Sequence, residues 1–175
     1  LNMGKCAIIP LHITDLNDVI TTRWVMTFEP TPLTIVGPVG TKHVVDHLLA
    51  SLGPDIAYRL AHHEDLDHEP PVHVIEIETG EIPLEGATVI TAGQTDHKPV
   101  EPSVGYRFDS GGHSVVVAGD TVPCDSLDAL CAGADALVHT AIRKDIIATV
   151  PMQRLLDTLD YHSSPEEAAA TAQRA

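Results

Sequence analysis

Val115-Val-Val-Ala-Gly-Asp-Thr121 is the stretch that decides the fold, because it places an apolar run directly before a carboxylate. Consecutive apolar residues bounded by a glycine are typical of a buried strand. The ends of such strands are rigid supports that present catalytic groups to neighbouring loops. The stretch therefore predicts a buried strand with Asp120 at its end as a candidate functional carboxylate.

Two further positions place a histidine at the edge of a predicted element. His97 lies in Thr95-Asp-His97, just beyond an expected strand, and His162 lies in Tyr161-His-Ser-Ser164. The latter stretch runs into Ser164-Pro-Glu-Glu167, which matches a helix capping box with proline at the first helical position. Each position alone has a structural explanation that is as good as a functional one. In this order the three residues are more specific.

The rest of the chain alternates between strand and helix patterns. The patterns predict helices over 15–28, 41–52 (ended by Gly53), 126–131 and from 164 onward, and strands over 33–37, 72–78, 87–92, 104–108, 113–118 and 136–139. Residues 55–71 are polar and predict a connection or edge structure. A strand meander followed by strand–helix alternation predicts a sheet covered by helices on its outer face, in the α/β (α+β) class.

The composition is that of a globular domain, or part of one, with 175 residues and 43% apolar content. A net charge of -15 repels nucleic acid and anionic membranes unless positive charge is concentrated locally. The pair Arg143-Lys144 is too small for that purpose. No apolar run approaches the ~20 residues that span a bilayer, so no membrane partner is expected.

Cysteine and the remaining histidines suggest no further site. The three cysteines, Cys6, Cys124 and Cys131, are odd in number and lack a Cys-x-x-Cys pair, which fits a reducing cytoplasm. His43 and His47 are four residues apart on an expected helix, a spacing that can bind zinc, but a solvated helix face is the favoured interpretation. For His62-His63 with His68, a polar loop is favoured over metal binding.

Several stretches together resemble a known family. Val117-Ala-Gly-Asp-Thr-Val-Pro123, Leu130 to Thr140, and Tyr161-His-Ser-Ser164 before an Ala-rich helix look like the C-terminal half of ribonuclease Z. Leu33-Thr-Ile-Val-Gly-Pro38 with Gly40-Thr41 is similar to that family's Gly-Pro-x-Gly-Thr turn. The resemblance runs from about Leu11 to Ala175 and implies a metallo-β-lactamase-type β-sandwich with outer helices. It implies one domain over residues 1–175.

The resemblance also implies the chemistry. His97 would bind one zinc ion, Asp120 would bridge two, and His162 would act beside the reacting phosphate as general acid or electrostatic stabiliser. Two close metal ions activate a shared water and polarise a phosphoryl oxygen, and histidine suits proton donation near neutral pH. The implied activity is that of a zinc-dependent endoribonuclease that processes tRNA 3′ ends, cytoplasmic and homodimeric, with precursor tRNA as its partner.

The sequence departs from the family pattern at the metal site. The family signature His-x-His-x-Asp-His is replaced by Pro10-Leu-His-Ile-Thr-Asp-Leu16, in which His12 is a further candidate metal ligand that could match the second or the last histidine. The acid expected to pair with His162 has no counterpart, and the last ligand histidine would lie beyond Ala175. The N-terminal strands also have no counterpart. We therefore expect an incomplete domain that binds zinc weakly or not at all and has little activity.

The substrate has alternatives. Ribonuclease Z proper commonly carries a basic arm between its isolated ligand histidine and the Gly-Asp-Thr strand end, whereas only a short hairpin separates His97 from Asp120 here. A metallo-β-lactamase-fold hydrolase of a small ester or cyclic phosphodiester is therefore an alternative. Another is an inactive truncated homologue that acts as a binding module, and the damaged first signature favours it.

Overall fold

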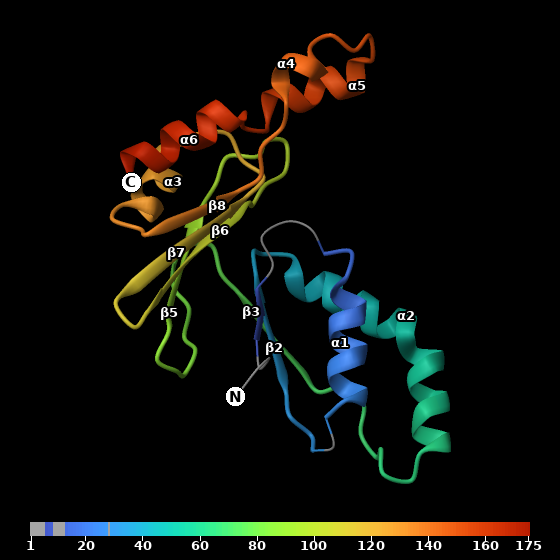
Figure 1. Cartoon of the computed structure of the whole chain (residues 1–175). Helices are drawn as coiled ribbons and strands as arrows, with labels where there is room; N and C mark the ends of the chain where they lie inside the picture. Colours follow the sequence, from blue (N-terminus) through green and yellow to red (C-terminus); the bar gives the residue numbers. More distant parts are fainter. Residues whose placement is uncertain (1–5, 9–12, 28) are drawn as a thin grey trace. The chain divides into compact units, whose positions relative to one another are not determined.

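The structure is a computed structural model that describes residues 6–8, 13–27 and 29–175. It divides into two compact units, Leu1–Glu76 and Ile77–Ala175, and each unit has its own sheet (Figure 1). The first unit contains β1 (Cys6–Ile8), α1 (Leu16–Val25), β2 (Leu33–Gly37), α2 (Thr41–His62) and β3 (Val72–Glu76).

The sheet of the first unit has the order β1-β2-β3, and its neighbouring strands are parallel. Parallel strands require a crossover connection, which the helices α1 and α2 provide. Leu16 and Ile20 of α1 and Val45 of α2 form one buried cluster with Leu33 and Ile35 of β2. Both helices therefore pack on the same face of this sheet, and the core of the unit lies between the helices and the sheet.

Helix α2 is longer than the sequence pattern predicts. The expected end at Gly53 is wrong, because the helix continues through Gly53 and Pro54 to His62. A proline inside a helix removes one backbone hydrogen bond. Ile56, only 7% exposed, continues the buried side of the helix beyond the proline. Burial of that side chain offsets the local cost, so residues 55–62 are helix and not the predicted connection.

A carboxylate closes the beginning of α2. The Oε1 atom of Glu76, at the end of β3, accepts hydrogen bonds from the backbone N–H groups of Gly40 at 2.8 Å and Lys42 at 3.0 Å. Gly40 has a φ of 102°, a conformation that favours glycine. Unpaired N–H groups at a helix start attract negative charge, and here the protein supplies that charge itself.

The second unit contains a larger, mixed sheet. Its strands are β4 (Gly80–Glu81), β5 (Val89–Gln94), β6 (Val104–Ser110), β7 (His113–Gly119) and β8 (Ala136–His139), in the order β4-β5-β6-β7-β8. The strands from β4 to β7 are antiparallel, and β8 runs parallel to β7. The predicted hairpin is confirmed, and it turns at Gly111 and Gly112, which have positive φ angles of 59° and 81°.

The helices of the second unit follow β7 in the chain. They are α3 (Asp125–Cys131), α4 (Lys144–Ile147), α5 (Gln153–Leu156), a 3₁₀ helix (Asp157–Asp160) and α6 (Pro165–Arg174). Helix α3 packs on the sheet through Leu127, which is fully buried in a cluster with Val116 and Ala118 of β7. Helix α6 is joined to α3 by a bond from Arg174 Nε to Asp128 Oδ2 at 2.7 Å.

The mixed α/β class expected from the sequence is confirmed. The single domain over residues 1–175 stays a prediction. In the part of the chain that the structure describes, no helix has the length and apolar character that crossing a membrane requires.

Candidate metal centre

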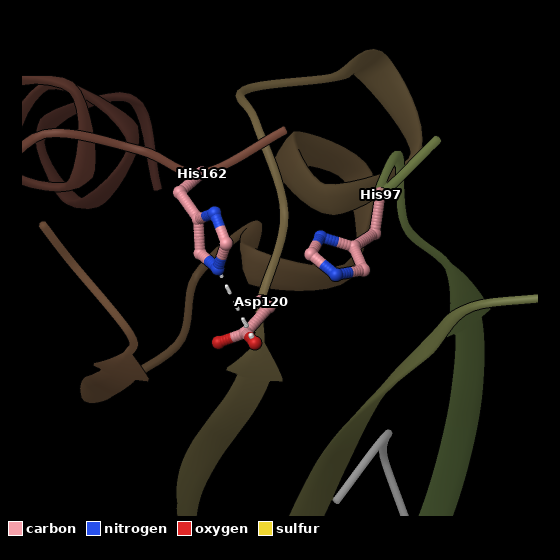
Figure 2. A group of neighbouring side chains, drawn as sticks. All are labelled: His97, Asp120 and His162. Atoms are coloured by element: carbon pink, nitrogen blue, oxygen red, sulfur yellow. Dashed lines mark ion pairs between the residues drawn. The ribbon is translucent and has the colours of Figure 1, made fainter. Parts of the chain in front are cut away.

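The structure brings together three residues that the sequence singles out. His97 lies in the loop after β5, Asp120 directly follows β7, and His162 lies between the 3₁₀ helix and α6 (Figure 2). Their ligand-capable atoms all lie within 4.8 Å of one another. Among the described residues, no other group of three histidine, cysteine or acidic side chains converges in this way. We call His97, Asp120 and His162 the candidate metal centre.

Backbone carbonyls orient both imidazoles. The Nδ1 atom of His97 lies 2.8 Å from the carbonyl oxygen of Tyr161, and the Nδ1 atom of His162 lies 3.0 Å from that of Thr158. A carbonyl oxygen can only accept, so each Nδ1 carries the hydrogen and donates it. In the neutral ring the Nε2 atom then bears a lone pair. Such carbonyl partners commonly fix the orientation of metal-binding histidines.

The carboxylate of Asp120 faces these lone pairs. Its Oδ2 atom lies 3.5 Å from Nε2 of His162, an ion pair when the ring is protonated (Figure 2). Asp120 and His97 are each only 5% exposed. Lone-pair atoms gathered with a buried carboxylate favour a cation or a proton between them, because a buried charge is costly without a counter-charge. Imidazole nitrogens with a carboxylate are a ligand set that suits zinc.

Buried hydroxyl groups tie the three loops of the centre together. Thr121 accepts a hydrogen bond from the backbone N–H of Asp96 at its Oγ1 atom, over 3.0 Å. Ser163 donates from Oγ to the carbonyl oxygen of Thr121 at 2.7 Å. Both Thr121 and Ser163 are fully buried. Each functional side chain is therefore next in sequence to a residue of this network, which fixes the spacing of the centre.

The helix after His162 begins with the predicted capping box, which is confirmed. Ser164 Oγ accepts from the backbone N–H of Glu167 at 3.2 Å, and Glu167 Oε2 accepts from that of Ser164 at 2.7 Å. Lys144 Nζ lies 2.8 Å from the same carboxylate oxygen. Lys144 and then the Ser164 N–H lower the pKa of Glu167 below its usual value. These contacts anchor the segment that carries His162.

Tyr161 packs against both histidines. Its ring centroid lies 5.1 Å from that of His97 and 4.8 Å from that of His162. The two imidazole centroids are themselves 5.1 Å apart and nearly perpendicular, at 83°. Tyr161 thus contributes both a carbonyl that orients His97 and a ring that packs against both imidazoles.

The sequence prediction and the structure differ in what they include. His12, the further candidate ligand, lies outside the described residues. The carbonyls of Thr158 and Tyr161 were not predicted, because every residue type supplies a carbonyl and the sequence carries no signal for it. The hydroxyls of Thr121 and Ser163 were also missed, although their positions next to Asp120 and His162 were a usable signal.

Comparisons with known proteins show the family of the chain. The family model described as "Beta-lactamase superfamily domain" matches residues 12–175. A relative named "Putative ribonuclease Z", from Mycobacterium tuberculosis (strain CDC 1551 / Oshkosh), is 55% identical over 166 residues, which are 94% of this chain and 74% of that protein. Ribonuclease Z of Mycobacterium bovis (strain BCG / Pasteur 1173P2) is also 55% identical over 94% of this chain, but the chain spans only 59% of its length.

A solved structure shows the same fold. The crystal structure of human tRNase Z, short form, superposes with a TM-score of 0.64 and 22% sequence identity over 97% of this chain and 68% of that one. A metallo-β-lactamase fold protein from Bacillus subtilis also gives a TM-score of 0.64, at 18% identity over 99% of this chain and 63% of that one. The fold, the family model and the close relatives agree, and the chain belongs to the β-lactamase superfamily and, within it, to the ribonuclease Z family.

Proposed function

We propose that this chain carries the metal centre of a zinc-dependent phosphodiesterase that cleaves RNA. The observation that supports the proposal most is the convergence of His97, Asp120 and His162 within 4.8 Å, at the ends of rigid elements. Family membership supports the same activity, since relatives that are 55% identical are named ribonuclease Z. Precursor tRNA is the proposed substrate, with the 3′ end as the site of cleavage.

His97 and Asp120 would hold the metal. The Nε2 lone pair of His97 is directed by the Tyr161 carbonyl, and Asp120 supplies carboxylate oxygens that can serve more than one ion. When bound, zinc lowers the pKa of a coordinated water and polarises a phosphoryl oxygen. Burial of both residues keeps bulk water away from the ligands and strengthens the electrostatic interactions among them.

His162 would act as the proton donor to the leaving oxygen. Its ring is held by the Thr158 carbonyl, so that Nε2 faces Asp120. In its protonated form the ring would keep its Nε2 hydrogen directed at the Asp120 carboxylate and would transfer that one proton to the oxygen that leaves phosphorus, becoming the neutral ring. Proton donation to a leaving oxygen by a positioned histidine contributes typically ~10²–10⁴-fold to a rate. The alternative role for His162 is that of a third metal ligand.

His12, the cytoplasmic location and the homodimer belong to the same proposal. His12 would add a metal ligand from the damaged first signature. The cytoplasmic location rests on the cysteine pattern, and both cysteines with described side chains, Cys124 and Cys131, are free thiols. A homodimer and RNA binding follow from family membership.

A smaller phosphodiester or ester is the second candidate substrate. The segment between His97 and Asp120 is a short hairpin whose basic residues, Lys98 and Arg107, are matched by the acidic residues Glu101 and Asp109. In addition, Arg107 already binds Asp109, with Nε 3.0 Å from Oδ2. This hairpin therefore offers no positively charged arm to hold the phosphates of a tRNA.

The two substrate classes can be separated by one assay. The protein is incubated with zinc and either precursor tRNA or bis(p-nitrophenyl) phosphate, next to the variants His97→Ala and His62→Ala. The proposal expects a low level of zinc-dependent cleavage of precursor tRNA, low because the first metal-binding signature is damaged, that His97→Ala abolishes and His62→Ala leaves intact. Cleavage of the small diester alone would favour the second candidate. If zinc binds but neither substrate is cleaved, the chain is a non-catalytic binding module.

A further inference from the structure

A pair of histidines lies outside the candidate metal centre, on the first turns of α2. His43 and His47 are four residues apart, so they project from successive turns on one side of the helix. Both are exposed, and their ring centroids are 4.1 Å apart. Neither ring belongs to the buried core of the first unit, which α2 reaches through Val45.

One hydrogen bond sets the chemical form of His47. Its Nδ1 atom lies 2.7 Å from the backbone carbonyl oxygen of His43. Because the carbonyl can only accept, Nδ1 carries the hydrogen and Nε2 bears the lone pair of the neutral ring. This is the arrangement by which proteins usually prepare a histidine as a metal ligand.

The charged neighbours of the pair are already engaged. Lys42 Nζ lies 2.7 Å from Oδ2 of Asp46, and the two residues are also four apart on the helix. This ion pair neutralises the ammonium group that would otherwise repel a cation beside His43. The two imidazoles are therefore the groups on this part of α2 best placed to bind an ion.

His62 and His63 provide a contrast within the same chain. Their ring centroids are also close, at 4.8 Å, but the rings meet nearly edge to face at 78°. They are consecutive in sequence, and His63 lies just beyond the end of α2 with an extended backbone, so the two residues do not share a helix face as residues four apart do. Ring proximity is thus shared by both pairs, whereas helical spacing is a property of His43 and His47 alone.

We propose that His43 and His47 form a surface site for a divalent transition-metal ion, with water completing the coordination. Imidazole suits nickel, copper and zinc, and affinity for a given nitrogen site rises toward copper. Two neutral ligands bind less tightly than a set that includes a carboxylate, so this site is weaker than the candidate metal centre. The inference is independent of the proposed catalytic function.

The test is a calorimetric titration with nickel chloride. It uses the full chain carrying His97→Ala and His162→Ala, so that the candidate metal centre does not contribute. We expect one nickel ion per chain, and adding His43→Ala or His47→Ala is expected to weaken binding about tenfold or more, since each removes one arm of a two-armed ligand. The matched variant His62→Ala/His63→Ala is expected to leave the titration unchanged.

Circular dichroism of every variant serves as the control for folding. Because alanine favours helix, α2 is expected to keep its helical signal in each variant. Two results would overturn the proposal. One is the absence of nickel binding in the background protein, and the other is binding that survives the combined removal of His43 and His47. Loss of binding in the His62→Ala/His63→Ala protein would move the site to that pair instead.

Discussion

His97 donates its Nδ1 hydrogen to the carbonyl oxygen of Tyr161 over 2.8 Å, across 64 residues of sequence. The next residue along the chain is His162. The segment that presents the candidate proton donor therefore also sets the ring orientation of the candidate metal ligand. Roles in metal binding and in proton transfer can still be separated by substitution, because each side chain has its own hydrogen-bond partner.

Substitution of His162 by glutamine is expected to lower kcat while zinc stays bound. A proton donor contributes typically ~10²–10⁴-fold to a rate, and glutamine cannot replace it. His97→Ala is expected to lose zinc instead. Zinc content by atomic emission, measured with the rate of phosphodiester cleavage, distinguishes the two. Should His162→Gln lose as much zinc as His97→Ala, His162 would be a metal ligand and not the proton donor.

Substitution of Ser163 by alanine is expected to destabilise the second unit. The change removes the hydrogen bond from Oγ to the Thr121 carbonyl at 2.7 Å, so the buried carbonyl oxygen loses a hydrogen-bond donor. Losses of this kind cost about 1–3 kcal/mol. Ser51→Ala, which removes a 2.7 Å bond from an exposed Oγ to Leu48, is the control and should stay within about 0.5 kcal/mol. Urea denaturation measures both, and equal effects would contradict the importance of the buried network.

The capping box of α6 makes the stability of the fold depend on pH in the acidic range. Lys144 and the Ser164 N–H lower the pKa of Glu167 in the folded state relative to its ordinary value of 4.5. A lowered carboxyl pKa stabilises the fold above the unfolded-state pKa, and this contribution is lost as the pH falls through the folded-state pKa. We therefore expect Glu167→Gln to flatten the decline in melting temperature between neutral and acidic pH.

The control for this experiment is Glu166→Gln. It removes the same charge from the same helical turn without breaking the 2.8 Å pair between Lys144 and Glu167. An acid profile of Glu167→Gln that matched the unmodified protein would show that the pair makes no contribution to folding.

Two glycines of the first unit should respond to alanine to different extents. A Cβ atom at Gly37 would overlap the side chain of Thr41, whose Oγ1 donates to the Pro38 carbonyl at 2.6 Å. Such overpacking typically costs about 1–3 kcal/mol. At Gly53, inside α2, nothing beyond the adjoining residues of the helix lies within 4 Å of the added atom, so alanine there should cost less than at Gly37. Thermal melts of both variants test this contrast.

Much of the fold could be predicted from the sequence, because its strands and caps have strong local signals. The apolar run before Asp120 and the capping box at Ser164 both appear where they were expected. The end of α2 was mistaken because Gly53 and Pro54 together resemble a stop, whereas the buried Ile56 keeps the helix going. A buried contact of this kind is tertiary and leaves no local signal.

The short elements between β8 and α6 could not be predicted. Helix α4, helix α5 and the 3₁₀ helix have no buried residue, so no apolar periodicity marks them. The residues of the candidate metal centre could be predicted, because strand ends and a helix cap point to His97, Asp120 and His162. The orientation of their side chains could not be predicted, since it comes from backbone oxygens that are distant in sequence.

The carboxylate of Glu76 at the start of α2 has a consequence for anion binding. A helix start with free N–H groups would bind anionic groups such as the phosphates of a polyanion. The backbone N–H groups of Gly40 and Lys42 already donate to Glu76. An incoming anion would therefore have to displace the Glu76 carboxylate, which competes intramolecularly. The start of α2 is therefore not a free anion-binding point, because Glu76 already occupies its N–H groups.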